Sequence, residues 1–537
     1  MTTITDHGNN KVKHGGIVHE SEVGDNDIDS LNQSNIGHDE DTTADKSFDS
    51  YKIPSDVRWK LFWSFKTPRS VKEKKQKLFL WTPPGQSKYE TRLVFKLDCI
   101  ILTYVCLSFF VRMLDASNVS NAYVSGMKED LNMHGTMYNW LTRSFYLAYA
   151  VAGFPITLLV TKIKPRFLLP TLELLWGVFC LLVITCKDYK SLMIIRGIQG
   201  ALEGGCFPIL HVILGTFYTT NELSTRTALF IASGSCGTMF GGYIQSGVYK
   251  TLNGAAGMPG WRWIFVIDFL ITIPVAILGY FIIPDAPYEA KPTRFLSQKD
   301  IDFCKKRVLV VKNVEQGHQF GFNVIKKILT SWQFYLFTFF YTVGHIPGDV
   351  GSYWNVVLKE QGYNVYQRNN YPTIQSAFDA IGCILAGMYA DSTGRFLDPL
   401  IILQGIWLIA VALIVKWDIP TPLLFICFVV CGASGGVSTL CCAWANDMTR
   451  EDHQLRAAVI GSLNLIYQGP HTVFSIMNYN TDLAPKYERG NRYSLGILSI
   501  CFLTTFVIFW FDRYQRRKRD YIDDLVNNEQ DDTLIEG

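Results

Sequence analysis

Residues 387–395 read Gly387-Met-Tyr-Ala-Asp391-Ser-Thr-Gly394-Arg395 and stand between two long apolar runs. The stretch places an acid, a helix-breaking glycine and a base in one short turn between two predicted helices. Such a loop can couple two helix ends to a neighbouring bundle through a charged contact that forms in only one state. We therefore predict a gating loop formed by Gly387, Asp391, Gly394 and Arg395. The alternative is a basic turn whose charge only keeps it on the cytoplasmic side of a membrane.

Apolar runs of about 20 residues, the length that a helix needs to cross a bilayer, recur on both sides of this loop. The first series lies near residues 98–117, 137–160, 167–186, 191–216, 227–249 and 263–284, and the second near 332–357, 373–391, 398–416, 421–445, 457–479 and 493–512. Backbone groups inside hydrocarbon must be hydrogen-bonded within their own segment, so helices are expected. The sequence predicts an all-α membrane protein with twelve transmembrane helices in two pseudo-symmetric six-helix bundles.

The composition of the 537-residue chain supports this interpretation. Hydrophobic residues make up 48% of it and charged residues only 18%, and the mean hydropathy is +0.13 in spite of long polar ends. The 50 Lys and Arg nearly balance the 47 Asp and Glu, which gives no argument for nucleic-acid binding. The 13 cysteines include no C-x-x-C pair and indicate neither a zinc site nor a disulfide framework. We expect no metal and no cofactor. No P-loop, H-E-x-x-H, G-x-S-x-G or dinucleotide motif is present, and we predict no enzyme.

Charge divides the chain into five segments. They are an N-terminal tail over 1–96, a first bundle over 97–285, a central loop over 286–330, a second bundle over 331–513 and a C-terminal tail over 514–537. The acidic residues 1–57 are expected to be disordered. Basic clusters flank the outermost spans and fill the central loop, so the positive-inside rule places both termini in the cytoplasm. No cleavable signal peptide is evident, and the first span is expected to act as the targeting signal.

The fourth apolar run carries two charged residues on one helical face. Arg196 and Glu203 are seven residues apart, which is two helical turns, and Gly200 and Gly204 would let a partner helix approach closely. A charge inside a span is costly and marks a transport pathway or a relay. Glu203 is therefore the leading proton-carrying candidate, and Arg196 would attract an organic anion or hold Glu203. The alternative is that both side chains only bond to neighbouring helices.

The first apolar run ends in a polar stripe. Arg112 and Asp115 are three residues apart, and Asn118 extends the same face by another turn. This stripe should face a cavity, because exposure to lipid would be expensive. The alternative is an ion pair within the helix that satisfies only itself.

Polar residues in the second series are candidates for the other side of a binding site between the two halves. They are His345, Asp349 and Tyr353 in the seventh run, Asp379 in the eighth and Asn446 at the end of the tenth. A site between two related halves needs polar groups from both of them.

Several of these motifs occur together in one known family. The run from Asp115 to Asp130, the run from Arg196 to Pro208, and the stretches 260–263 and 367–372 resemble the fungal allantoate permease family of anion:cation symporters. The loop at 387–395 resembles the signature loop of the major facilitator superfamily, which contains that family. The resemblance covers about residues 90–515 and implies a twelve-helix fold in the plasma membrane.

The resemblance also implies a function and roles for individual residues. It implies proton-coupled uptake of a small carboxylate, with functional acids at Glu203 and Asp115. Many relatives carry an arginine directly after that aspartate, where this chain has Ala116, and Arg112 on the neighbouring face is expected to take its place. Arg112, Arg196, Asn118, His345 and Tyr353 are the candidates for binding the anion.

The predicted mechanism is alternating access, in which two halves rock about a central site. The partners are a small organic anion, protons and the lipid bilayer, and no oligomer is required. A carboxylate vitamin such as pantothenate is expected first, while biotin, nicotinate, allantoate or other ureido acids, and sulfonates stay open. A nutrient-sensing receptor built on a transporter fold is the alternative from another functional class.

Overall fold

The computed structural model of the chain describes residues 54–63, 87–160, 162–285, 290–292, 296–311, 326, 328–449 and 453–536. Every element assigned in this part is a helix. The chain divides into two compact units, residues 64–520 and residues 1–63 with 521–537. In the smaller unit, α2 (Ser55–Trp63) packs the rings of Trp59, Phe62 and Trp63 against one another. The predicted site residues all lie in the larger unit.

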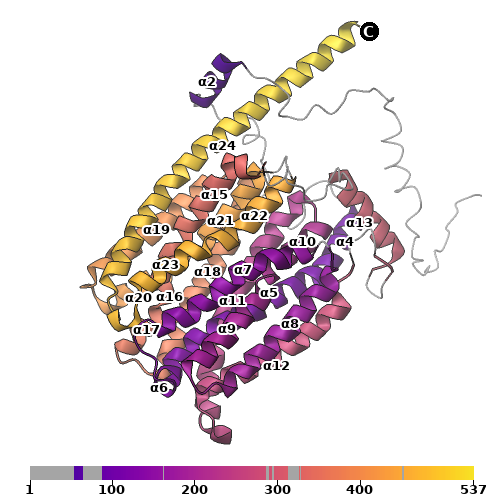
Figure 1. Ribbon diagram of the computed structural model, residues 1–537. Coiled ribbons are helices and arrows are strands. Elements are labelled where there is room, and N and C mark those ends of the chain that lie inside the picture. The colour runs from indigo at the N-terminus through magenta and orange to yellow at the C-terminus, as the bar shows by residue number, and fades with distance from the viewer. Residues whose placement is uncertain are drawn as a thin grey trace, which may run out of the picture. The chain divides into compact units, whose positions relative to one another are not determined.

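The first half of the larger unit consists of six long helical rods (Figure 1). The first rod stacks α4 (Lys88–Leu97), η2 (Asp98–Leu102), α5 (Thr103–Ala122), η3 (Tyr123–Met127) and α6 (Lys128–Asp130) end to end. The others are α7 (Met137–Leu159), α8 (Pro165–Leu182) with η4 (Val183–Thr185), α9 (Tyr189–Glu203) with α10 (Cys206–Phe217), α11 (Thr220–Leu252) and α12 (Gly260–Ile282).

The second half forms six further rods. They are α15 (Trp332–His345) with η6 (Ile346–Gly348), α16 (Asp349–Ser352) and α17 (Trp354–Glu360), then α18 (Val365–Thr393), α19 (Leu397–Lys416), α20 (Thr421–Val430) with α21 (Ala433–Met448), α22 (His453–Ile466) with α23 (Gln468–Asn478), and α24 (Glu488–Glu536). In Figure 1 the indigo-to-magenta rods of the first half and the orange-to-yellow rods of the second half lie on opposite sides of this unit.

The predicted fold class is confirmed. Each of the predicted apolar runs overlaps one rod, and seven helical stretches of the described residues are long and apolar enough to cross a membrane. The remaining five rods are α7, α11, the α15–α17 rod, α18 and the α22–α23 rod. All five contribute side chains to a cavity between the halves. Their lower hydropathy follows from that position, because a helix facing a polar cavity and another helix bundle needs less apolar surface than one facing lipid.

The two halves pack on each other most extensively along α11 with α18 and along α7 with the α22–α23 rod. Within the first half, α7 also packs closely on α9, where a methyl group on Gly200 would strike the backbone carbonyl of Phe145. The prediction that Gly200 allows a partner helix to approach closely is confirmed.

The central loop contains a helix that is docked on the first half. This helix, α13 (Gln298–Val311), accepts hydrogen bonds at Asp300 from Lys96 (2.7 Å) and Tyr89 (2.8 Å) at the start of the first rod. Arg307 of α13 pairs with Glu222 at the start of α11 (3.0 Å). Apolar residues complete the contact, and Leu296, Ile301 and Cys304 are buried in the core of the first half. The segment predicted as a central loop is therefore partly a packed helix.

The predicted tails differ in how much of them the structure describes. The helical part of the first rod begins at Lys88, inside the predicted N-terminal tail, and the disorder predicted for residues 1–57 falls almost wholly outside the described residues. At the other end α24 continues to Glu536, so the predicted C-terminal tail is a continuation of the last helix.

Candidate functional site

A cavity of about 440 Å³ lies between the two halves of the larger unit. Its walls come from α5, α7 and α11 of the first half, and from the α15–α17, α18, α20–α21 and α22–α23 rods of the second. Apart from tyrosines, its titratable side chains are Arg143, His345, Asp349, Asp379 and His471. The volume suits a small organic molecule, because ligand pockets commonly measure about 300–1,000 Å³.

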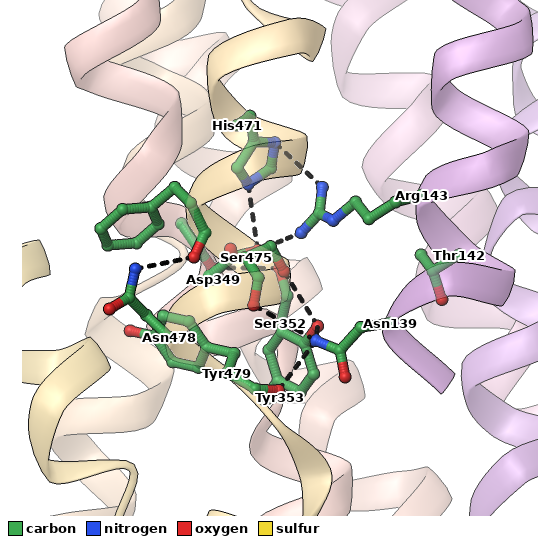
Figure 2. A network of polar contacts seen from close by, with 12 residues as sticks. Asn139, Thr142, Arg143, Asp349, Ser352, Tyr353, His471, Ser475, Asn478 and Tyr479 are labelled. Carbon is green, nitrogen blue, oxygen red and sulfur yellow. Dashed lines mark hydrogen bonds and ion pairs between the residues drawn. The ribbon is translucent and has the colours of Figure 1, made fainter. Parts of the chain in front are cut away.

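A buried charged triad joins the two halves at the cavity wall (Figure 2). Arg143 on α7 donates from Nη2 to Oδ1 of Asp349 on α16 (2.7 Å) and from Nη1 to Nδ1 of His471 on α23 (3.1 Å). The Nε2 atom of His471 lies 3.0 Å from the same Asp349 oxygen. These contacts tie one rod of the first half to two rods of the second.

The triad also assigns the tautomer of His471. A guanidinium only donates hydrogen bonds and a carboxylate only accepts them. Nδ1 of His471 must therefore accept from Arg143, while Nε2 carries the hydrogen that it donates to Asp349. A neutral imidazole satisfies both partners, so the triad is balanced with one positive and one negative charge.

Hydrogen bonds to Asn139 extend this contact between the halves by one helical turn. The Nδ2 atom of Asn139 on α7 donates to the Tyr353 hydroxyl (2.8 Å) and to the backbone carbonyls of Ser475 (3.3 Å) and Tyr479 (2.8 Å). The hydroxyl groups of Tyr353 and Ser475 are also 3.0 Å apart, as Figure 2 shows. All three partners of Asn139 belong to the second half.

The local sequence explains why Asp349 faces the cavity. Pro347 lacks a backbone N–H and stands in η6, where the seventh rod breaks after His345. A new helix, α16, then begins at Asp349. His345, Asp349 and Tyr353 follow one another at intervals of four residues and so share one face of this rod, and all three line the cavity.

Most hydrogen bonds between the halves gather at one end of the cavity, where α5 ends and α7 begins. Asn355 contacts Ser120, and Asn369 donates to Ser125 (2.9 Å). Two ion pairs lie further out, between Lys128 and Glu360 (3.1 Å) and between Lys359 and Glu129 (2.7 Å). Thr481 and Asp482 bond to the backbone of Gly135. These contacts close the end that the predicted orientation places outside the cell.

A second charged cluster is buried inside the first half. Arg196 on α9 donates to Asp115 on α5 (3.1 Å), and Gln199 donates to the same carboxylate oxygen (2.5 Å). Arg112 on α5 lies 3.3 Å from Glu203 on α9. Asp115 and Glu203 are fully buried. Neither Glu203 oxygen accepts a hydrogen bond from the described residues.

A third acid, Asp268 on α12, completes this cluster. Asn118 donates to Asp268 (2.9 Å), and Sγ of Cys180 lies 3.2 Å from Asp268 and 3.3 Å from Asp115. Donor atoms of Asp115, Cys180 and Asp268 all lie within 4.8 Å of one another, a spacing that a metal ion can bridge. In this structure the two carboxylates instead accept hydrogen bonds from Asn118, Arg196, Gln199 and the Cys180 thiol. The expectation of no metal stays a prediction.

The structure separates the predicted site residues into two groups. His345 and Tyr353 line the cavity between the halves. Asp115, Glu203, Arg112, Arg196 and Asn118 come together inside the first half and are not among the residues that line the cavity. The ion pairs also differ from the prediction, which grouped Arg112 with Asp115 and Arg196 with Glu203, each within one helix. In the structure the pairs run between α5 and α9, from Arg112 to Glu203 and from Arg196 to Asp115.

The predicted gating loop forms the C-terminal end of the eighth rod, α18. A methyl group on Gly387 would meet Ala228 of α11, so this glycine keeps the two halves in contact. Gly394 ends α18 with a φ of 65°, a left-handed conformation that favours glycine. Arg395 lies 3.7 Å from Asp398 at the start of α19. The side chain of Asp391 lies outside the described residues.

Two residues of the charged triad, Arg143 and His471, are not among the site residues predicted from the sequence. Arg143 lies in the second apolar run and His471 in the eleventh, each without a charged neighbour three or four residues away. A charged residue within an apolar run is itself a signal of function, and this rule would have found Arg143.

Sequence comparison assigns the family. The model of the Major Facilitator Superfamily matches residues 105–475, which is more than half of the chain. The chain belongs to the Major Facilitator Superfamily. It is therefore a multi-pass membrane transporter and not an enzyme.

Known members of the Major Facilitator Superfamily resemble this chain over most of its length. The MFS transporter PfmaC of Pestalotiopsis fici is 31% identical, covering 82% of this chain and 83% of that protein. The pantothenate transporter liz1 of Schizosaccharomyces pombe is 30% identical, covering 82% of this chain and 86% of that protein. A solved structure of the proton:xylose symporter XylE aligns with a TM-score of 0.62 at 14% identity, covering 79% of this chain and 96% of that chain, and shows the shared fold.

Proposed function

We propose that this transporter imports a small organic anion together with protons by alternating access. The observation that carries this proposal is the cluster of Asp115, Glu203 and Asp268 with Arg112 and Arg196 inside the first half. Three carboxylates and two guanidiniums are neutral together only when one carboxyl holds a proton. A net charge buried in a membrane protein is costly, so a proton belongs to this cluster in at least one state of the cycle.

Glu203 is the proposed proton carrier within the cluster. Asp115 accepts hydrogen bonds from Arg196 and Gln199, which it would have to give up on protonation. Glu203 accepts none that meets hydrogen-bond geometry from the described residues, and Arg112 lies beside it at 3.3 Å. Arg112 then moves between a paired and an unpaired state as Glu203 titrates.

Pantothenate is the proposed substrate to test first, within the fungal allantoate permease family. A pantothenate transporter shares 30% of its residues with this chain, and the cavity volume suits a molecule of that size. We place the protein in the plasma membrane with both termini in the cytoplasm, because the basic clusters flank the outermost spans. With that orientation the cavity is closed toward the outside.

The two halves, residues 97–285 and 331–513, are the proposed moving bodies. The central loop over 286–330 joins them, and α13 moves with the first half because its contacts lie there. The loop from Gly387 to Arg395 belongs to the cytoplasmic gate.

The test is uptake of labelled pantothenate in yeast that lacks its own vitamin permeases. Uptake is measured at about pH 5 and about pH 7.5, with and without an uncoupler, and with biotin, nicotinate, allantoate and a sulfonate as competitors. We expect accumulation that is faster at the lower pH and is abolished by the uncoupler. An uptake rate that changes neither with pH nor with the uncoupler would refute proton coupling. Normal surface expression without uptake of any compound would favour a sensor instead.

A further inference from the structure

Arg143 is the only lysine or arginine among the described residues that line the cavity. The other two candidates, Arg112 and Arg196, are held by Glu203 and Asp115 inside the first half. An organic anion that leaves water for this cavity needs a fixed positive charge, and a guanidinium matches the geometry of a carboxylate. Arg143 is placed to supply that charge.

The contact between Arg143 and Asp349 uses only part of what each group offers. One carboxylate oxygen, Oδ1, receives both Arg143 and His471. The second oxygen, Oδ2, and the Nε atom of Arg143 are buried and have no hydrogen-bond partner in the described structure. A two-point contact between a guanidinium and a carboxylate is the stronger arrangement, so this one-point pair can be replaced by a ligand.

We propose, on the basis of the function proposed above, that Arg143 binds the carboxylate of the transported anion and that Asp349 competes with the anion for this guanidinium. In the described state Asp349 holds Arg143. When the anion binds, its two oxygens take two N–H groups of Arg143, and Asp349 remains hydrogen-bonded to His471. No covalent bond changes in this exchange.

The exchange connects binding to the movement of the halves. Arg143 belongs to the first half, whereas Asp349 and His471 both belong to the second. Binding of the anion therefore removes an ion pair between the halves and leaves a contact within one of them. When Asp349 takes Arg143 back, it releases the anion and restores the pair. Asp349 thus acts as an internal competitor that favours release.

The experiment measures binding to the purified full-length chain in lipid nanodiscs. The probes are pantothenate, biotin and nicotinate, each compared with its uncharged alcohol or amide. Wild type should prefer one carboxylate over its neutral analogue by about tenfold or more. In Arg143→Gln this preference should fall to less than about twofold, with affinity for the neutral analogue unchanged. Asp349→Asn should bind the carboxylate several-fold more tightly, and in uptake it should lower KM and kcat together.

Control variants distinguish a role of Arg143 in binding the anion from a purely structural ion pair. The double variant Arg143→Gln with Asp349→Asn removes both charges and leaves no unpaired one, so it should fold and still lose the preference. The matched control is Arg226→Gln with Asp98→Asn, which removes another buried pair (2.9 Å) of the first half, outside the cavity, and should keep the preference. If wild type prefers a carboxylate and the Arg143 double variant prefers it equally, this inference fails and the proposed function stands. If wild type binds no carboxylate of the set, this inference fails together with the proposed vitamin substrate.

Discussion

Asp115 and Glu203 are both fully buried on neighbouring helices, yet their surroundings differ. Asp115 is surrounded by donors from Arg196, Gln199 and Cys180. Glu203 has Arg112 beside it and no hydrogen bond from the described residues. Buried polar atoms are normally hydrogen-bonded, and an exception calls for an explanation. A carboxyl that changes its protonation during the cycle provides one.

We expect Glu203→Gln to abolish proton-driven accumulation while the protein still reaches the cell surface. The amide keeps the shape of the side chain and cannot carry the proton. Uptake at about pH 5 should fall by at least tenfold, whereas exchange of labelled for unlabelled substrate should persist, because exchange needs no net proton movement.

The matched control is Glu173→Gln. Glu173 is an equally buried carboxyl of the first half, hydrogen-bonded to Tyr104 (2.8 Å) and Ser108. This variant should retain uptake. If Glu203→Gln accumulates substrate normally, the proton assignment is wrong.

The sequence predicts which charged residues are important better than it predicts their ion-pair partners. Arg112, Asp115, Arg196 and Glu203 stand out because each is a charge within an apolar run, and the structure brings them together. Their pairing across two helices depends on how α5 and α9 are rotated, which the spacing along one helix does not reveal. The partners in the triad are further apart still, 206 residues from Arg143 to Asp349 and 328 to His471.

At the scale of the helices, close packing between α7 and α9 holds the charged cluster in place. Gly200 lies one turn before Glu203, against the backbone of Phe145. The same helix carries Gly197, where an added methyl group would meet nothing within 4 Å. The two glycines provide a matched pair for testing the contact.

We expect Gly200→Ala to destabilise the protein and Gly197→Ala to leave it unchanged or slightly more stable. Overpacking in a tight interface costs about 1–3 kcal/mol, whereas alanine improves a helix where space is free. The measurement is the temperature of unfolding of each variant purified in detergent. Equal unfolding temperatures for the two variants would contradict the close contact.

The docking of α13 depends on the charge of Asp300. Burial would raise the pKa of this carboxyl, but hydrogen bonds from Lys96, Tyr89 and Ser297 outweigh it and lower the pKa. A carboxylate whose pKa is lower in the docked state stabilises docking at neutral pH. That contribution is lost as the pH falls below about 4 and toward the lowered value.

We expect Asp300→Asn to expose Cys304, which lies on the buried face of α13. Its rate of reaction with a dithiodipyridine, followed by peptide mass spectrometry, should rise several-fold at neutral pH for a loss of about 1 kcal/mol. The difference from wild type should persist down to about pH 4 and shrink as the pH falls below that value. Asp302→Asn on the exposed side of α13 is the control and should react like wild type. An unchanged rate for Asp300→Asn would show that apolar contacts alone hold the helix.

At the scale of the whole transporter, the contacts that close one end of the cavity set the balance between its states. The two ion pairs at this end join the first rod to the seventh, and each includes an exposed or partly exposed carboxylate, although Lys359 is buried. Exposed pairs contribute about 0.2–1 kcal/mol each. Removing both should therefore change the population of the open state by several-fold.

We expect the double variant Glu129→Gln with Glu360→Gln to open the cavity toward the outside more often. A cysteine placed at Ser376, which lines the cavity, should react about two to ten times faster with a membrane-impermeant thiol reagent added outside intact cells. The control is Glu488→Gln, which removes an exposed ion pair with Arg492 within α24. Faster reaction from the cytoplasmic side instead would reverse the proposed orientation.

The fold could be predicted from the sequence more fully than the site. Apolar runs of membrane-spanning length locate all the rods, because lipid imposes the same requirement on each of them. Breaks within rods are harder to foresee, and the 3-10 turn at Ile346–Gly348, directly before Asp349, lies inside one continuous predicted run. The cavity itself depends on how two halves separated by more than 200 residues pack together.

The pairing of Arg143 with Asp349 also determines how the empty transporter responds to an electric field. One elementary charge moved through 100 mV changes the free energy by about 2.3 kcal/mol. Two opposite charges 2.7 Å apart that move together carry almost no net charge. This pair therefore adds almost no voltage dependence to the return of the empty protein, and any voltage dependence of that step comes from the charge of the cluster around Glu203.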